Sequence, residues 1–166
     1  MNRPGDVLRG LLAERELVRA PEALTPLMAV AVQQAGFEAM YLGGGSSAAL
    51  HHALPDIGLV APIELQPLAA SLTAVADIPL IVDLDHGADT TLGVGRVVRC
   101  FEDAGAAAIH LEDTSGNKKV KGLTSLVSVD AFRANIASAV SACRQGMMVI
   151  ARSDAWMTGG QSRRGG

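Results

Sequence analysis

The chain has few aromatic residues, few cysteines and no long apolar run, and each shortage excludes a class of protein. Aromatic residues make up only 3% of the 166 residues, so Ala, Val and Leu must build most of the core. Cys100 and Cys143 lie in amphipathic helical patterns, which favour buried thiols over a disulfide or metal ligands. No apolar run reaches the ~18 residues of a membrane span, and Met1-Asn2-Arg3-Pro4 does not begin a signal peptide. We therefore expect a cytoplasmic protein with no membrane partner.

The chain also lacks a strong charge and the common catalytic motifs. Its formal net charge is −3, which argues against general binding of nucleic acid. No Gly-x-Ser-x-Gly elbow, phosphate-binding Walker loop or zinc-type Cys/His spacing occurs in the sequence. Function must therefore come from other residues.

Helical and strand patterns alternate along the chain. The expected helices span residues 4–17, 25–36, 62–76, 90–104 and 129–144, and the expected strands span 17–20, 38–43, 79–83, 107–111 and 147–152. This alternation requires a parallel sheet, open or closed into a barrel. We predict an α/β domain of the (β/α)₈ TIM-barrel type over residues 1–157, with only about the first five β/α units present. Residues 158–166 have no apolar periodicity and are predicted to be a disordered tail.

Two of the expected strands end in carboxylates. Asp83 and Asp85 follow one apolar run, and Glu112 follows the next. Burying neighbouring carboxylates is unfavourable unless a cation lies between them, and oxygen ligands suit Mg²⁺. The alternative is that these acids are helix caps or surface turn residues.

Other polar groups are expected at the same edge of the sheet. The loop 43–47 could bind an anion through its amides, or be a plain turn. Arg152 ends the last strand, where a guanidinium could bind a substrate carboxylate. His86 could titrate near neutrality. Lys118 lies in a long connection that could be a lid or a surface basic cluster.

The residues alone predict no catalytic role for the remaining polar candidates. His51 and His52 are expected on the surface, and Asp56 is expected in a solvated loop. His110 is predicted to point away from the metal side of its strand, as a structural histidine.

Five short segments together resemble the isocitrate lyase/phosphoenolpyruvate mutase superfamily. They are Tyr41-Leu42-Gly43-Gly44-Gly45-Ser46, Leu54-Pro55-Asp56-Ile57-Gly58-Leu59, Val82-Asp83-Leu84-Asp85-His86-Gly87, Ile109-His110-Leu111-Glu112-Asp113 and Ile150-Ala151-Arg152-Ser153-Asp154-Ala155. They occur in the family's order and spacing. The resemblance implies a (β/α)₈ barrel that binds Mg²⁺, or Mn²⁺ in its place, and stabilises the enolate of a small oxo or hydroxy acid.

The resemblance also implies residue roles. Asp83 would bind the metal directly, while Asp56, Asp85 and Glu112 would hold metal-bound waters. The amides of Gly44 and Gly45, with Ser46 beside them, and Arg152 would hold the anionic ends of the substrate. We assign catalytic roles to Arg152, His86 and Lys118.

The lid is expected to select the reaction. Isocitrate and methylisocitrate lyases carry an acidic Cys where this chain has Val120, which cannot transfer a proton. The Asp-x-Asp-His-Gly and Leu-Glu-Asp-Thr segments look most like the oxaloacetate decarboxylase branch. We therefore predict a Mg²⁺-dependent lyase or decarboxylase acting on an oxo-dicarboxylate such as oxaloacetate. The alternatives are phosphonopyruvate hydrolysis or phosphoenolpyruvate mutation on the same scaffold, or an inactive fragment.

Two departures from the family pattern bear on activity. Ala88-Asp89-Thr90 stands where the family has Tyr-Gly-Asn, and the chain stops after its fifth expected strand. A barrel with five strands cannot close, which leaves strand edges and apolar inner faces exposed. We therefore expect a truncated barrel that forms homo-oligomers.

Overall fold

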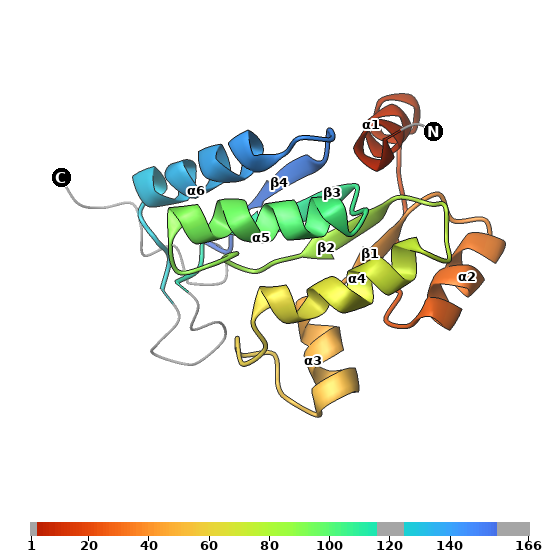
Figure 1. Ribbon diagram of the computed structural model, residues 1–166, viewed down its shortest axis with the longest axis horizontal. Coiled ribbons are helices and arrows are strands. Elements are labelled where there is room, and N and C mark those ends of the chain that lie inside the picture. Colours follow the sequence, from red (N-terminus) through yellow and green to blue (C-terminus); the bar gives the residue numbers. More distant parts are fainter. Residues whose placement is uncertain (1–2, 116–124, 156–166) are drawn as a thin grey trace.

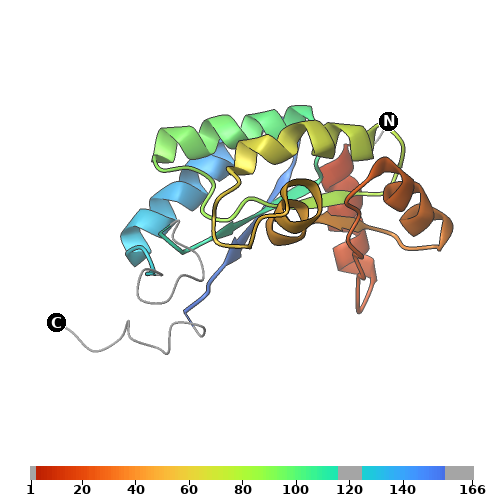
Figure 2. The ribbon, with the colours of Figure 1, turned by 90° about the horizontal axis from the view of Figure 1, so that it is seen from below.

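The computed structural model describes residues 3–115 and 125–155 and shows a parallel sheet with several helices along one face and the first helix on the other (Figures 1 and 2). The helices are α1 (Pro4–Glu14), α2 (Pro26–Gln34), α3 (Gly44–His52), α4 (Gln66–Thr73), α5 (Thr91–Asp103) and α6 (Val129–Ala142), with the 3₁₀ helix η1 (Pro62–Leu65). The strands are β1 (Met40–Leu42), β2 (Leu80–Asp83), β3 (Ala108–Glu112) and β4 (Met148–Arg152). They pair in chain order, β1-β2-β3-β4, and every pairing is parallel. The predicted α/β class and parallel sheet are confirmed.

Short polar side chains start several of these helices, as the sequence indicates. The hydroxyls of Thr25, Thr90 and Ser128 accept hydrogen bonds from backbone amides of α2, α5 and α6. Each bond satisfies an amide that has no partner within its helix. Helix α5 ends before Gly105, whose φ of +85° reverses the chain toward β3.

The expected strand at residues 17–20 is wrong in its position. The chain instead forms an isolated parallel bridge between Glu22 and Tyr41, two residues after the predicted segment ends. The amide of Tyr41 donates to Pro21, and the amide of Ala23 donates to Tyr41, each at 2.9 Å. Residues 21–23 therefore take the place of a first strand, but too briefly to count as one.

The two faces of the sheet have different neighbours. On the helix-covered face, Leu42, Val82 and Ile109 belong to the main core together with residues of α2, α4, α5 and α6. The opposite face carries a smaller cluster at its N-terminal end, built on the fully buried Leu8 of α1. Strand alternation assigns each side chain to one face or the other.

Helix α1 reaches across this smaller cluster to the turn before β4. A Cβ atom on Gly5 would overlap the carbonyl oxygen of Gly146 and lie 2.8 Å from its carbonyl carbon. Only glycine allows this approach, because the neighbour is backbone and cannot rotate away. Gly10 of the same helix has no atom near the place of its missing Cβ.

Among the described residues, no helix has the length and apolar character needed to cross a membrane.

We predict that Gly5→Ala lowers the free energy of unfolding by about 2 kcal/mol, because the added methyl group meets the backbone of Gly146. Gly10→Ala is the matched control and should raise stability by about 0.5–1 kcal/mol, since alanine is the better helix former. Urea unfolding of the two variants measures both effects. Equal shifts in the two variants would show that α1 does not pack on this turn.

Candidate metal and substrate site

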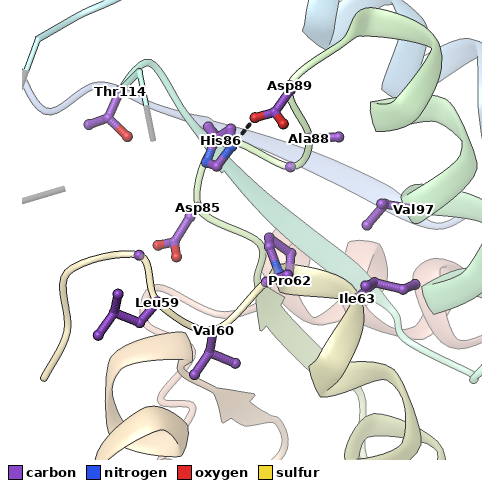
Figure 3. Close-up of a pocket in the computed structure, with 13 residues that line it drawn as sticks. Leu59, Val60, Pro62, Ile63, Asp85, His86, Ala88, Asp89, Val97 and Thr114 are labelled. Atoms are coloured by element: carbon purple, nitrogen blue, oxygen red, sulfur yellow. Dashed lines mark ion pairs between the residues drawn. The ribbon is translucent and has the colours of Figure 1, made fainter. Parts of the chain in front are cut away.

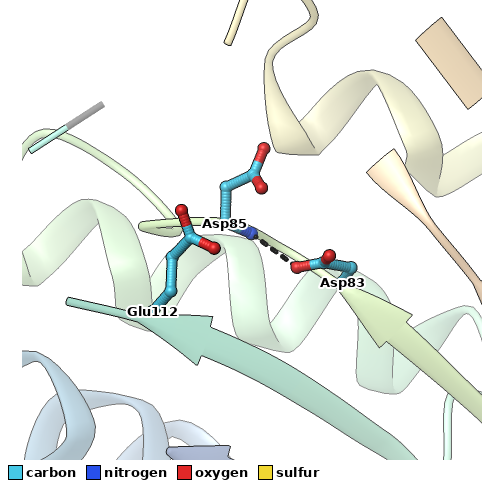
Figure 4. A group of neighbouring side chains, drawn as sticks. All are labelled: Asp83, Asp85 and Glu112. Atoms are coloured by element: carbon cyan, nitrogen blue, oxygen red, sulfur yellow. Dashed lines mark hydrogen bonds between the residues drawn. The ribbon is translucent and has the colours of Figure 1, made fainter. Parts of the chain in front are cut away.

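Three carboxylates meet where β2 and β3 end. One oxygen each of Asp83, Asp85 and Glu112 lies within 4.8 Å of the others, and Figure 4 shows the three side chains as close neighbours. Asp83 and Glu112 are 8% and 2% exposed, so water screens their mutual repulsion poorly. The structure thus brings together three of the four residues predicted to serve the metal.

A turn, rather than continuous strand geometry, places Asp85 beside Asp83. Strand β2 ends at Asp83, and Asp85 has a left-handed φ of +48°, which is strained for a residue with a side chain. The Asp85 amide donates to Oδ1 of Asp83 at 3.2 Å, and its carbonyl accepts the amide of Glu112 at 2.8 Å. The backbone therefore ties the three acids together at the cost of local strain.

Thr114 fixes the orientation of the Glu112 carboxylate. Its hydroxyl donates to Oε1 of Glu112 at 2.6 Å, and both side chains are buried. The other oxygen, Oε2, lies 3.1 Å from Nη2 of Arg152. Each oxygen of Glu112 consequently has a defined neighbour, which limits rotation of the side chain.

Arg152, at the end of β4, supplies positive charge to the group. Its guanidinium lies 3.4 Å from Asp83 and 3.1 Å from Glu112, and it also contacts Asp154 at 2.9 Å. Burial acts to lower the pKa of Arg152, but the hydrogen bond to Asp154 and the charges of Glu112 and Asp83 outweigh it and raise the pKa. The side chain therefore stays charged across the physiological range.

The donor set fits a hard divalent cation. Three clustered carboxylates carry more negative charge than the single guanidinium of Arg152 balances. Oxygen-only ligands of this kind suit Mg²⁺ or Mn²⁺. Asp83, Asp85 and Glu112 are thus the residues that would hold such an ion.

The predicted loop at residues 43–47 is wrong: Gly44, Gly45 and Ser46 form the first turn of α3. The amides at a helix N-terminus point outward and favour anions, so an anion-binding role is still open to them. A Cβ on Gly44 would lie 3.6 Å from Oδ2 of Asp85, and a Cβ on Gly45 would lie 2.6 Å from Cγ of Asp56. The glycines therefore allow α3 to approach two of the predicted metal-site acids.

A cavity of about 410 Å³ lies between α3 and the end of β2, where Asp83 stands. Asp56, Asp83 and Arg152 border it, together with Gly45 and Ser46. Asp56 is separate from the group of three clustered acids, since it approaches the site from the connection after α3. The cavity is thus flanked by Asp83 and Arg152 on one side and the N-terminus of α3 on the other.

His86 lies beside a different cavity. Together with Asp85, it lines a space of about 370 Å³ that is otherwise bordered mainly by apolar residues such as Leu59 and Ile63 (Figure 3). Its Nε2 is 3.5 Å from Oδ1 of Asp89. The structure thus separates His86 from the cavity that Arg152 borders.

The predicted face of His110 is wrong. Residues two apart on a strand share a face, so His110 lies on the same face as Glu112, and it pairs in register with Asp83. Its Nδ1 is 3.3 Å from the hydroxyl of Tyr41, and burial lowers its pKa. Burial, and then the charge of Asp83, raises the pKa of Tyr41. Both side chains are therefore neutral neighbours of the carboxylate group near neutral pH.

Four residues of the site were not predicted as such: Tyr41, Asp113, Thr114 and Asp154. All of them stand within or directly beside the five segments of the resemblance, and Asp154 follows Arg152 at the same spacing that separates Asp83 from Asp85. That repeated spacing was a usable signal for Asp154. His51 and His52 are exposed as expected, although Nε2 of His51 contacts the carbonyl oxygen of Leu24 at 2.9 Å.

Several predictions concern residues outside the described part of the chain. Lys118 and Val120, on which the lid hypothesis depends, lie there, and so does the tail at 158–166.

Comparison with known families gives one match over most of the sequence. Residues 8–165 match the profile of the family described as phosphoenolpyruvate phosphomutase. A 2-methylisocitrate lyase from Aeropyrum pernix is 40% identical over 157 residues, which cover 93% of this chain and 50% of that protein. The 2,3-dimethylmalate lyase of Eubacterium barkeri is 34% identical over 156 residues, covering 92% and 54%.

Solved structures with the same fold include two enzyme complexes. Oxaloacetate acetylhydrolase bound to 3,3-difluorooxalacetate aligns with a TM-score of 0.86 at 28% identity, covering 95% of this chain and 56% of that one. Phosphonopyruvate hydrolase with oxalate and Mg²⁺ aligns at 0.83 with 31% identity, covering 96% and 55%. The chain spans about half the length of the relatives it matches.

We predict that Mg²⁺ or Mn²⁺ raises the melting temperature, because the ion relieves repulsion among Asp83, Asp85 and Glu112. At a free ion concentration about 100 times Kd, the gain is about 2.7 kcal/mol, or roughly 5–10 °C. Asp83→Asn should abolish the shift, whereas Asp130→Asn on the exposed surface of α6 should keep it. A shift that survives in Asp83→Asn would place the ion elsewhere, and no shift in the parent would exclude the site.

Proposed function

This chain belongs to the phosphoenolpyruvate mutase/isocitrate lyase superfamily, and on that premise we propose that it serves metal-dependent cleavage of a carbon–carbon bond in a small oxo or hydroxy acid. The first candidate reaction is the decarboxylation of an oxo-dicarboxylate such as oxaloacetate. The observation that supports this most is the group of Asp83, Asp85 and Glu112 beside Arg152, with Asp83 and Arg152 bordering a cavity. The relatives that share the fold act on small carboxylates, according to their names.

The carboxylates and the guanidinium would have separate tasks. Asp83, Asp85 and Glu112 would hold Mg²⁺, with Mn²⁺ as a substitute and Asp56 reaching the same cavity from α3's side. When bound, a divalent cation supplies the positive charge that stabilises an oxygen next to the breaking bond.

The anionic ends of the substrate need donors at both sides of the cavity. Arg152 offers one, because it remains charged and borders the cavity beside Asp83. The first-turn amides of α3 at Gly44, Gly45 and Ser46 offer the other. A dicarboxylate would thus lie between a guanidinium and a helix N-terminus, which favours an acid with two anionic groups.

Proton transfer needs a titratable group beside the site. His86 and Lys118 are the proposed groups. Nε2 of His86 faces Asp89 in the neighbouring cavity, while Asp85 borders that cavity as well. Transfer by His86 would therefore run along the Asp85 side of the site.

A second candidate reaction is cleavage of 2-methylisocitrate. It is favoured by the 40% identity to the Aeropyrum pernix enzyme of that name. Against it, Val120 stands where the lyases of the family have a Cys acid, so this chain lacks the proton donor that they use. Phosphonopyruvate hydrolysis or phosphoenolpyruvate mutation on the same scaffold is less favoured, since the lid lacks the mutase Asn-Ser pair.

We also propose a cytoplasmic location. Cys100 and Cys143 are both free thiols, which suits a reducing compartment.

We predict that the chain releases pyruvate from oxaloacetate faster than the same concentration of Mg²⁺ alone, and that Asp83→Asn reduces the rate to that background. Succinate release from 2-methylisocitrate, assayed in parallel, should be undetectable because Val120 cannot donate a proton. Succinate release without oxaloacetate turnover would reverse the ranking of the two candidates. Turnover of neither substrate would contradict the proposed activity of this chain.

We further propose that the chain self-associates. The inner face of the sheet, opposite the main core, carries three apolar side chains that are only half-buried: Ile81, Met148 and Ile150. In the described residues, no strand pairs with the outer side of β4. Exposed strand edges and apolar faces favour association.

We predict a species of at least twice the mass of one chain in size-exclusion chromatography with light scattering. Ile150→Lys should shift it toward monomer, because the charge lies on the inner face. Ala151→Lys, on the opposite face of the same strand, should not. A monodisperse monomer in the parent would show that the face is covered by the chain itself.

A further inference from the structure

The guanidinium of Arg152 is held on three sides by acids. Nε and Nη2 donate to the two oxygens of Asp154, each at 2.9 Å. Nη1 is 3.4 Å from Asp83, and Nη2 is 3.1 Å from Glu112. The two-pronged contact with Asp154 fixes the plane of the guanidinium, and this plane directs the remaining hydrogens toward the proposed metal ligands.

Asp154 is itself anchored. It is 4% exposed, and its amide donates to Oδ1 of Asp113 at 2.8 Å. The hydroxyl of Ser153 donates to the other oxygen of Asp113 at 2.5 Å. Glu112 and Arg152 are partners in the β3–β4 register, so the end of β3 carries both a metal-site acid and the anchor for the Arg152 turn. The position of the guanidinium is therefore set by backbone pairing.

We propose that Arg152 is a resident counter-cation of the carboxylate group and that Asp154 is the positioning residue that holds it there. This inference rests on the proposed metal site, because Arg152 and a divalent ion would both interact with the carboxylates of Asp83 and Glu112. Without the ion, Arg152 balances part of their charge and stabilises the fold. With the ion, Asp154 keeps the guanidinium beside the cavity, where it can face a substrate anion.

A counter-cation role and a purely structural role predict different changes in metal affinity when Arg152 or Asp154 is replaced. Removing the charge of Arg152 takes a positive group away from the ion, so the ion should bind more tightly. Removing the charge of Asp154 should weaken metal binding. It takes away negative charge near the ion, and Arg152 then pairs more strongly with Asp83 and Glu112. A merely structural pair would lower stability in both variants and leave metal affinity unchanged.

The first arm of the test uses metal-free protein in EDTA and does not depend on metal binding. Glu112→Gln alone should lower the melting temperature, because it breaks the ion pair with Arg152. In an Arg152→Gln background the same change should raise the melting temperature, because it then removes repulsion between carboxylates. A change of the same sign and size in both backgrounds would overturn the counter-cation role.

The second arm measures Mn²⁺ affinity by calorimetry at constant ionic strength. Arg152→Gln should tighten binding and Asp154→Asn should weaken it, each by about fivefold or more. Asp154→Glu, which keeps the charge, should return the affinity toward that of the parent. Arg133→Gln and Asp130→Asn remove the partners of an exposed ion pair on α6 and should leave the affinity unchanged.

The two arms separate this inference from the proposed function. A parent that binds no Mn²⁺ contradicts the proposed function, while the metal-free arm still decides the role of Arg152. A parent that binds Mn²⁺, with the same affinity in Arg152→Gln and Asp154→Asn, contradicts the inference alone. If Arg152→Gln does not fold, Arg152→Lys replaces it: the lysine keeps the charge, so tighter binding there would count against the inference.

Discussion

The repulsion among Asp83, Asp85 and Glu112 is the constraint on which the rest of the site depends. Two of these carboxylates are almost fully buried, and all three lie within 4.8 Å of one another. Such an arrangement is stable only where positive charge or hydrogen-bond donors are directed at it. The structure supplies both through Arg152 and through the hydroxyl of Thr114. The left-handed backbone of Asp85 adds conformational strain, which the surrounding contacts must offset.

The sheet makes this arrangement possible because its two faces are used differently. Side chains on one face, among them Val82 and Ile109, pack in the main core beneath the helices and hold the strands in register. That register then fixes where the alternate side chains Asp83, Glu112 and Arg152 stand on the other face. Stability and chemistry are thus carried by alternate residues of the same strands, as in barrels whose sites gather at the C-terminal strand ends.

Much of this could be predicted from the sequence, and the errors have physical causes. The acids and Arg152 were found because apolar runs that end in charge mark strand ends. The helix at Gly44 was missed because glycine has low helix propensity, which packing against Asp56 and Asp85 overrides. The face of His110 was misassigned although its spacing of two from Glu112 contained the answer. The spacing of Asp154 from Arg152 pointed to the residue, but its contacts depend on the turn after β4, which that spacing does not specify.

Anomalous diffraction from crystals of this chain soaked in Mn²⁺ would locate the bound ion directly. We predict a single strong peak among the side-chain oxygens of Asp83, Asp85 and Glu112, with the Arg152 guanidinium still bound to Asp154. A peak at another place, or none at a Mn²⁺ concentration that saturates binding in solution, would contradict it.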